Sequence, residues 1–186
     1  MKNLFISTLA VLSIFISSIS FGATVSFDFD SLTAGTVTSA TPVSLNSFTT
    51  LSTDGEIEIG SPLFGGSGLN ILGFGSGDAI FSFDTSAVSV TSITLEGSSN
   101  NVPVIITTFD LGGLVQDSIQ TDNSWSLPAT LTNTSPISSI NVRLLESEIS
   151  NLSITYSAVP VPAAIWLFGS GLIALAGLFR LKNRRL

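Results

Sequence analysis

The chain has 186 residues, of which only 10% are charged, and its formal net charge is −7. It has no cysteine and no histidine, which excludes disulfide bonds, thiolate nucleophiles, Ser-His-Asp catalysis and zinc sites with histidine ligands. All thirteen acidic residues lie between Asp28 and Glu148, where Arg143 is the one basic residue, and this balance argues against nucleic-acid binding because phosphate recognition depends on cationic side chains.

The N-terminal segment has the layout of a secretory signal peptide. Lys2 is followed by an apolar run over residues 4–19, and small residues close the segment at Gly22 and Ala23. We expect cleavage after Gly22 or Ala23 and assign residues 1–23 to the signal. The alternative is an uncleaved anchor helix.

The segment 24–158 is long enough for one domain and alternates polar with apolar residues. The clearest alternation covers residues 25–30, 57–59, 79–83 and 152–156. Further strands are expected at 69–74, 88–95, 102–109, 114–119 and 137–145, with a hairpin at 109–114 and a run at 147–152 leading into the last strand. No stretch has a sustained apolar stripe of helical period. The pattern predicts an all-β fold, an antiparallel β-sandwich of jelly-roll-like type.

One pair of carboxylates in this segment has the spacing of residues that share a strand face. Glu56 and Glu58 are two residues apart, and glycoside hydrolysis uses two carboxylates held close together. The polar face of an alternating strand is normally the solvated one, so we expect both side chains to face solvent.

A second group of oxygen-bearing side chains is a candidate for calcium, which prefers hard oxygen ligands. A jelly roll brings its first and last strands together, so the side chains listed next could converge on one structural ion. They are Asp28, Asp30, Glu148 and Asn151. No calcium-binding loop spacing is present, and solvated edge charges are the alternative. No other cofactor is expected.

Trp125 is the only tryptophan of the segment and follows a polar turn at residues 122–124. An exposed aromatic ring there could stack on a sugar ring, which makes Trp125 a candidate ligand contact. Packing in the core is the alternative.

The C-terminal segment has the features of a membrane-spanning helix. Residues 163–179 are uncharged and apolar over a length that crosses most of a bilayer, and Trp166 lies where it can anchor the outer interface. The basic residues that follow are Arg180, Lys182, Arg184 and Arg185. They predict a cytoplasmic tail at 180–186 and a domain on the outer side of the membrane.

A short motif precedes and enters this helix. It consists of Val159, Pro160, Val161, Pro162 and Ala163, followed by Trp166 and the glycines Gly169 and Gly171. In this order, residues 159–186 resemble the PEP-CTERM sorting signal, in a form similar to the variant that begins Val-Pro-Leu-Pro-Ala, since Val161 stands where the name-giving motif has glutamate. The resemblance implies a Gram-negative cell that makes extracellular polysaccharide, and an exosortase, a membrane-embedded protease, that recognises the signal and removes the helix. A plain single-pass anchor is the alternative.

These features predict an exported protein that is held in the inner membrane with its domain in the periplasm, and that reaches the cell surface or extracellular matrix after processing. The leading interpretation is a non-enzymatic adhesive or carbohydrate-binding protein that acts with extracellular polysaccharide, as in a biofilm. A small secreted polysaccharide hydrolase and a purely structural coat protein are the alternatives.

Overall fold

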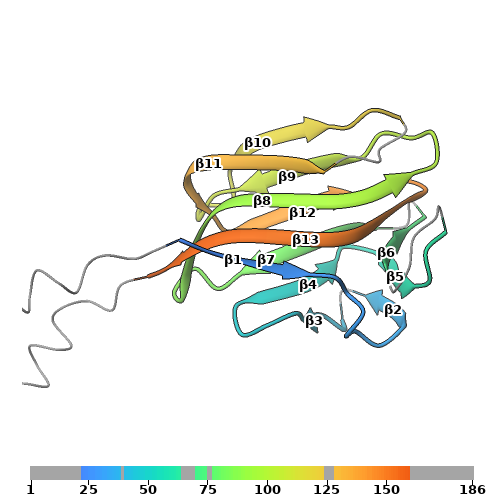
Figure 1. Cartoon of the computed structure of the whole chain (residues 1–186), viewed down its shortest axis with the longest axis horizontal. Coiled ribbons are helices and arrows are strands. Elements are labelled where there is room, and N and C mark those ends of the chain that lie inside the picture. The colour runs from blue at the N-terminus through green and yellow to red at the C-terminus, as the bar shows by residue number, and fades with distance from the viewer. Residues whose placement is uncertain (1–21, 39, 64–69, 75–76, 124–127, 160–186) are drawn as a thin grey trace, which may run out of the picture. The chain divides into compact units, whose positions relative to one another are not determined.

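A computed structural model of the chain describes residues 22–38, 40–63, 70–74, 77–123 and 128–159 (Figure 1). Within these residues all regular structure is β-strand. The strands are β1 (Ala23–Phe27), β2 (Gly35–Thr38), β3 (Val43–Ser44), β4 (Thr49–Thr53), β5 (Glu56–Gly60), β6 (Asn70–Gly73), β7 (Asp78–Phe83), β8 (Val88–Ser99), β9 (Ile105–Phe109), β10 (Val115–Gln120), β11 (Ala129–Ile137), β12 (Ser139–Arg143) and β13 (Ser147–Ala158).

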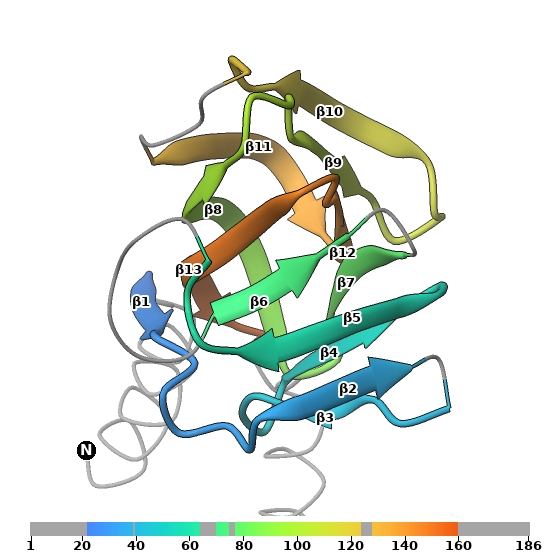
Figure 2. The same ribbon diagram turned by 90° about the vertical axis from the view of Figure 1, so that its right-hand side faces the viewer.

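The strands form two sheets in which all pairs are antiparallel (Figure 2). Sheet A has the order β11-β8-β13-β6-β5-β2, and β1 pairs with β13. Sheet B has the order β10-β9-β12-β7-β4-β3. Both sheets contribute to a single core cluster, so the architecture is a β-sandwich, and the all-β prediction is confirmed.

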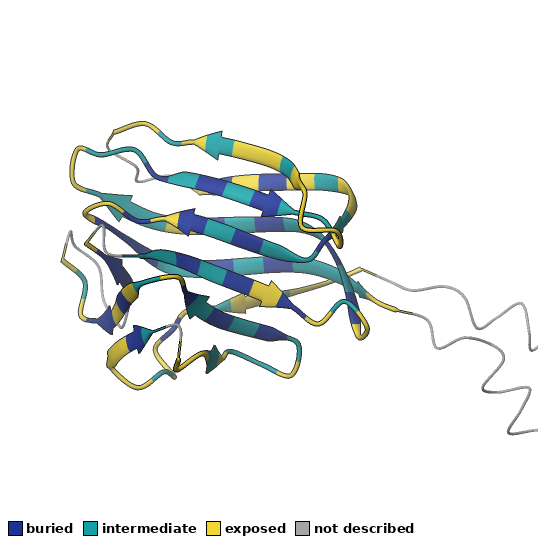
Figure 3. Cartoon of the chain, turned by 180° about the vertical axis from the view of Figure 1, so that it is seen from behind, coloured by how far each residue is buried: buried dark blue, intermediate teal, exposed yellow. Residues whose placement is uncertain are grey.

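Alternation along most strands separates the core from the surface, as the banding in Figure 3 shows. On β7, Ala79, Phe81 and Phe83 are buried, whereas the residues between them are exposed or half-buried. Phe29, which follows β1 with a φ of 58°, stacks on Phe81 at a centroid distance of 6.5 Å. Aromatic and aliphatic packing of this kind provides the main stabilisation of the fold.

The strands predicted from alternation are present as β1, β5, β6, β7, β8, β9, β10, β12 and β13. The predicted hairpin at 109–114 joins β9 to β10, and Asp110 closes its turn by accepting bonds from the N–H groups of Gly112 and Leu114 at 2.8 and 2.9 Å. The predicted run at 147–152 is the first half of β13.

Four strands, β2, β3, β4 and β11, were not predicted from the sequence. Thr49 and Thr53 are buried inward-facing residues on β4, so threonine fills core positions where the pattern rule expects an aliphatic side chain. On β11, Pro136 falls near a register shift that interrupts the alternation. In both regions polar residues and proline interrupt the alternation of apolar and polar residues, so the sequence pattern does not predict a strand.

No described residue belongs to a helix that could span a membrane. Residues 1–21 of the predicted signal peptide (1–23), and the predicted sorting segment from Pro160 to the C-terminus, lie outside the described residues. Ala23, the last residue assigned to the signal, is the first residue of β1.

Candidate functional site

The outer face of sheet B carries apolar, amide and charged side chains close together. Buried Ile106 and Thr108 on β9, and buried Ile140 and Val142 on β12, point into the core. Because side chains alternate, the residues between them point outward. Pairing then sets them side by side: Asn141 lies opposite Thr107 of β9, and Arg143 lies opposite Ile105 on one side and Asp78 of β7 on the other.

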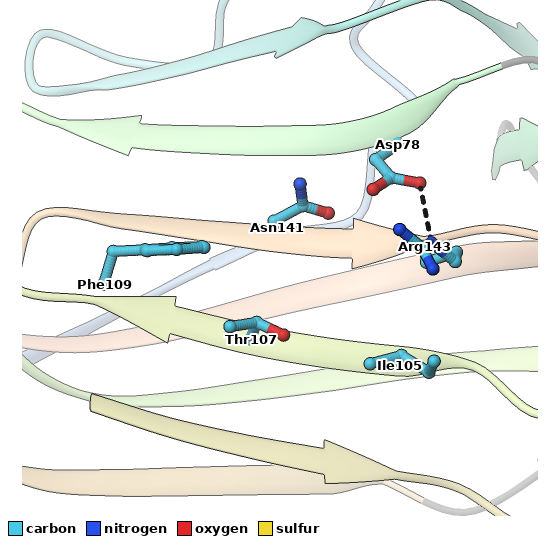
Figure 4. A pocket seen from close by; sticks show the side chains of 6 residues that line it. All are labelled: Asp78, Ile105, Thr107, Phe109, Asn141 and Arg143. Carbon is cyan, nitrogen blue, oxygen red and sulfur yellow. Dashed lines mark ion pairs between the residues drawn. The ribbon is translucent and has the colours of Figure 1, made fainter. Parts of the chain in front are cut away.

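These outward residues line an open depression of about 280 Å³, the sheet B depression. Its lining residues are Asp78, Ile105, Thr107, Phe109, Asn141 and Arg143. Figure 4 shows Phe109 at one end of the group, Arg143 and Asp78 at the other, and Asn141 between them. The depression therefore offers an aromatic ring and several hydrogen-bonding groups within one shallow surface.

An ion pair closes one end of the depression. Arg143 Nε lies 3.6 Å from Asp78 Oδ1, and the side chains are 57% and 15% exposed. The Asp78 N–H donates to Asp54 Oδ1 at 2.8 Å, which holds the start of β7 in place. Because the pair uses Nε, the two terminal nitrogens of the guanidinium can donate to a ligand, while Asp78 can accept.

The centre and the opposite end supply neutral groups. The Asn141 amide makes no hydrogen bond with any described residue, so its donor and acceptor both remain for a ligand. The Thr107 hydroxyl is bonded to the Ser118 hydroxyl of β10 at 3.1 Å. Phe109 is half-buried, and the exposed Val115 of β10 lies opposite it. An apolar platform beside an amide and an ion pair is suited to a ligand with both apolar and hydroxyl-bearing surfaces.

The four residues predicted for calcium lie in different surroundings. Asp28 and Asp30 are exposed in the turn after β1, where the Asp30 N–H donates to Asp28 Oδ1 at 3.3 Å. Glu148 is only 1% exposed, and its oxygens accept from the Leu63 N–H at 2.8 Å and the Ser98 hydroxyl at 2.7 Å.

Asn151, the fourth of these residues, donates through Nδ2 to Glu96 Oε2 at 3.5 Å, and its Oδ1 is buried without a hydrogen-bond partner. The described part of the chain contains no group of three acidic side chains placed to hold a metal ion. Calcium binding by these residues stays a prediction.

The other predicted residues are placed in part. Glu56 and Glu58 both face solvent on β5, as expected from their spacing. Val159 is described, and its N–H donates to the Ala87 carbonyl at 3.0 Å. Trp125 and the remaining sorting-motif and basic-tail residues lie outside the described residues.

The lining residues of the sheet B depression were missed from the sequence. They come from three strands that are distant in the chain, and their juxtaposition depends on the pairing of β12 with both β7 and β9. The one available signal was Arg143, the lone cation of an acidic segment.

No protein-family model and no curated protein matches this chain. Among solved structures, it is similar to a carbohydrate-binding module from Cellvibrio mixtus lichenase 5A in complex with cellotriose, with 16% identity, a TM-score of 0.34, and coverage of 64% of this chain and 95% of that one. It is also similar to the enzymatically active domain of bacteriophage CBA120 tailspike protein 4, with 17% identity, a TM-score of 0.27, and coverage of 61% and 20%. With TM-scores this low, neither likeness bears on the function of this chain.

Proposed function

We propose that this chain is an exported jelly-roll-like β-sandwich that binds a neutral polysaccharide in the sheet B depression. The observation that carries the proposal is the combination, in one open surface, of Phe109, the unengaged amide of Asn141 and the Arg143–Asp78 pair. An open depression on a sheet can accept an internal stretch of a long chain, whereas a closed pocket accepts only a small molecule or a chain end.

Charge favours a neutral ligand over an acidic one. The segment from Asp28 to Glu148 contains thirteen acidic residues, and Arg143 is the only basic residue there. Arg143 is already paired with Asp78, so the depression has no net positive charge to offset this field. A polyanion would be repelled over about 8 Å at physiological ionic strength.

In this proposal each group has its own part in binding. The ring of Phe109 offers an apolar surface for the CH face of a sugar. Asn141 can donate to one hydroxyl and accept from another, and the Arg143–Asp78 pair offers the same two functions at the far end. Each such bond contributes about 0.5–1.5 kcal/mol net, so useful affinity requires several sugars bound together.

Affinity electrophoresis of the full chain tests the proposal, with mixed-linkage β-glucan, galactomannan or dextran cast in the gel. Phe109→Ala and Asn141→Ala should each reduce the retardation. The matched control is Thr50→Ala, because Thr50 lies on the same sheet face but outside the depression. Equal retardation of all three variants, or none for the unaltered protein, would contradict the proposal.

We further propose that residues 1–23 direct export and that residues 159–186 are a sorting signal recognised by an exosortase. The order of the motif residues Val159, Pro160, Val161, Pro162 and Ala163, followed by Trp166 and the basic tail, supports this assignment. The protein would lie in the inner membrane first and at the cell surface or in the matrix after processing.

Immunoblots in a host that contains an exosortase test the sorting assignment. Replacing Pro160 and Pro162 should leave membrane insertion intact and block processing, so that a slightly larger membrane-bound species accumulates. Replacing the four basic residues after the helix with serine should instead weaken retention and orientation. If the unaltered protein and the proline variant run at the same size, the segment is only an anchor.

A further inference from the structure

The outer face of sheet A has a different character, because two adjacent rows across four strands consist only of hydroxyl side chains. The first row runs Thr132, Ser92, Thr155, Thr24 and the second runs Thr130, Thr94, Ser153, Ser26, across β11, β8, β13 and β1. We call these eight residues the hydroxyl face. Of the residues between the rows, Leu131, Ile93 and Ile154 are buried and Val25 is half-buried against the core, so the hydroxyls all lie on the outer side.

The hydrogen bonds within the hydroxyl face join its flanking strands and leave its centre open. On one side, Ser92 bonds to Thr132 at 3.0 Å and Thr94 to Thr130 at 2.8 Å. On the other side, Thr155 bonds to Thr24 at 3.1 Å and Ser153 to Ser26 at 2.7 Å. Among the described residues no bond joins the β8 hydroxyls to the β13 hydroxyls across the central seam.

Each bonded pair keeps capacity for a ligand. A hydroxyl has one donor and two acceptor positions, so the pairs that contain Thr94, Ser153 and Thr155 each still have one free O–H and several lone pairs. The Ser92 hydroxyl also donates to the Leu131 carbonyl at 3.1 Å, so the Ser92–Thr132 pair offers a ligand lone pairs alone. Neighbouring strands lie roughly 4.8 Å apart, and residues two apart on a strand lie about 7 Å apart. Ser92, Thr94, Ser153 and Thr155 therefore frame a seam with hydrogen-bonding groups on both sides at regular intervals.

The absence of charge on the hydroxyl face indicates what can cover it. The eight residues are neutral, while the segment around them carries thirteen acidic residues and one arginine. A second copy of the chain would bring two strongly acidic domains together, and a polyanion would meet the same repulsion. A neutral polymer with many hydroxyls avoids this repulsion and matches the donors and acceptors of the face.

We propose that the hydroxyl face is a second polysaccharide-binding surface, which takes a neutral glycan chain along the seam between β8 and β13. This site is on the opposite face of the sandwich from the sheet B depression and uses none of its residues. With one site on each face, a single domain can bridge two polysaccharide chains. A polysaccharide with many copies of its repeating sugar unit is then bound with avidity.

The test uses a variant of the full chain with all four seam hydroxyls removed, S92A/T94V/S153A/T155V. Valine keeps the shape and strand preference of threonine, so folding is retained. The control is Thr36→Val, which removes an exposed threonine of sheet A that lies opposite Glu58 and outside the hydroxyl face. A second arm carries F109A/N141A in the sheet B depression.

Retardation in gels of mixed-linkage β-glucan, galactomannan or dextran measures binding, and the viscosity of the polysaccharide solution measures bridging. The hydroxyl face is the site that remains intact in F109A/N141A. In the seam variant the affinity of this face for the polysaccharide should fall at least about tenfold, because four hydroxyls are lost. Either variant alone should abolish the rise in viscosity while keeping part of the retardation. Thr36→Val should match the unaltered protein in both measurements.

The outcomes separate the two proposals. If the seam variant matches the unaltered protein while F109A/N141A fails to bind, the second surface is refuted and the depression stands. If F109A/N141A matches the unaltered protein and the seam variant fails, the proposed function is refuted and the second surface stands. If sedimentation shows a dimer that only the seam variant dissociates, with retardation unchanged, the face binds a second copy and the inference is wrong.

Discussion

The outer faces of the two sheets differ strongly although their inner faces are alike. Most inward residues on both sheets are aliphatic or aromatic, such as Phe81 on β7 and Leu95 on β8, and they belong to one core. Outside, sheet A has rows of uniform hydroxyls, whereas sheet B has an aromatic ring, an amide and an ion pair around a depression. The shared core constrains the side chains that point inward, while the outward positions are free to differ in function.

Exchanging an inward residue should have the largest effect on stability. Phe81 is fully buried and stacks on Phe29, so Phe81→Ala should lower the free energy of unfolding by about 3–5 kcal/mol. Ser82, the next residue on β7, is exposed, and Ser82→Ala should change the free energy of unfolding by about 0.5 kcal/mol or less. Urea denaturation measures both, and similar losses for the two would contradict the separation of inner and outer faces.

A buried carboxylate on sheet A should give the next largest effect. Glu148→Ala leaves the Leu63 N–H and the Ser98 hydroxyl without their acceptor, which should cost about 1–3 kcal/mol. Glu148→Gln keeps the shape and one acceptor, so its loss should be smaller. Urea denaturation measures both variants, and an alanine variant as stable as the unaltered protein would show that this carboxylate does not hold Leu63.

Removing the guanidinium of the sheet B depression should affect binding more than folding. Arg143→Gln should weaken neutral-glycan binding about tenfold, equivalent to about 1.4 kcal/mol. Its effect on unfolding should stay within about 1 kcal/mol, because the ion pair with Asp78 is largely exposed on the Arg143 side. Affinity electrophoresis and urea denaturation give the two numbers.

Arg143→Lys serves as the matched variant, since it keeps the charge and loses the planar fork of donors. It should bind with intermediate strength. Full binding by Arg143→Gln would remove Arg143 from the site.

The smallest expected effect is a dependence of stability on pH at the turn before β8. The Ser86 hydroxyl donates to Asp84 at 2.6 Å, and the Ser86 N–H donates to it at 3.0 Å. The hydroxyl bond most of all, and the N–H bond after it, lower the pKa of Asp84 from its ordinary 3.8. A carboxyl whose pKa is lower in the folded state stabilises the fold above its unfolded pKa and loses that contribution as the pH falls through the folded value.

Thermal melts of the unaltered protein and Asp84→Asn should therefore differ at about pH 5 and converge at about pH 2. A difference in melting temperature that stays constant over this range would show that ionisation of Asp84 has no part in stability.

The sequence allowed the fold class and most strands to be predicted because aliphatic and aromatic residues alternate with polar ones in those segments. It did not reveal β4, where Thr49 and Thr53 occupy buried positions that hydrophobicity does not distinguish from surface ones. Nor did alternation around Phe29 predict that its backbone adopts a φ of 58° as it packs on Phe81.

The candidate site could not be predicted for a different reason. Thr107 and Asn141 are both outward residues of strands that were expected from the sequence, but their proximity arises from the pairing of β9 with β12. Pairing between strands 30 or so residues apart depends on the whole topology, which alternation does not specify. The same limit applies to the rows of the hydroxyl face, whose four strands are β1, β8, β11 and β13 and are spread along the domain sequence.

The most direct test of neutral-glycan binding by sheet B is an NMR titration of the isotope-labelled full chain. The ligand is an oligosaccharide cut from the neutral polysaccharide that retards the protein most. If the sheet B depression binds the glycan, the resonances of Thr107, Phe109, Asn141 and Arg143 shift saturably, and those of Thr50 and Ser52 on the same face do not move. Saturation that leaves the four depression residues unshifted would contradict it.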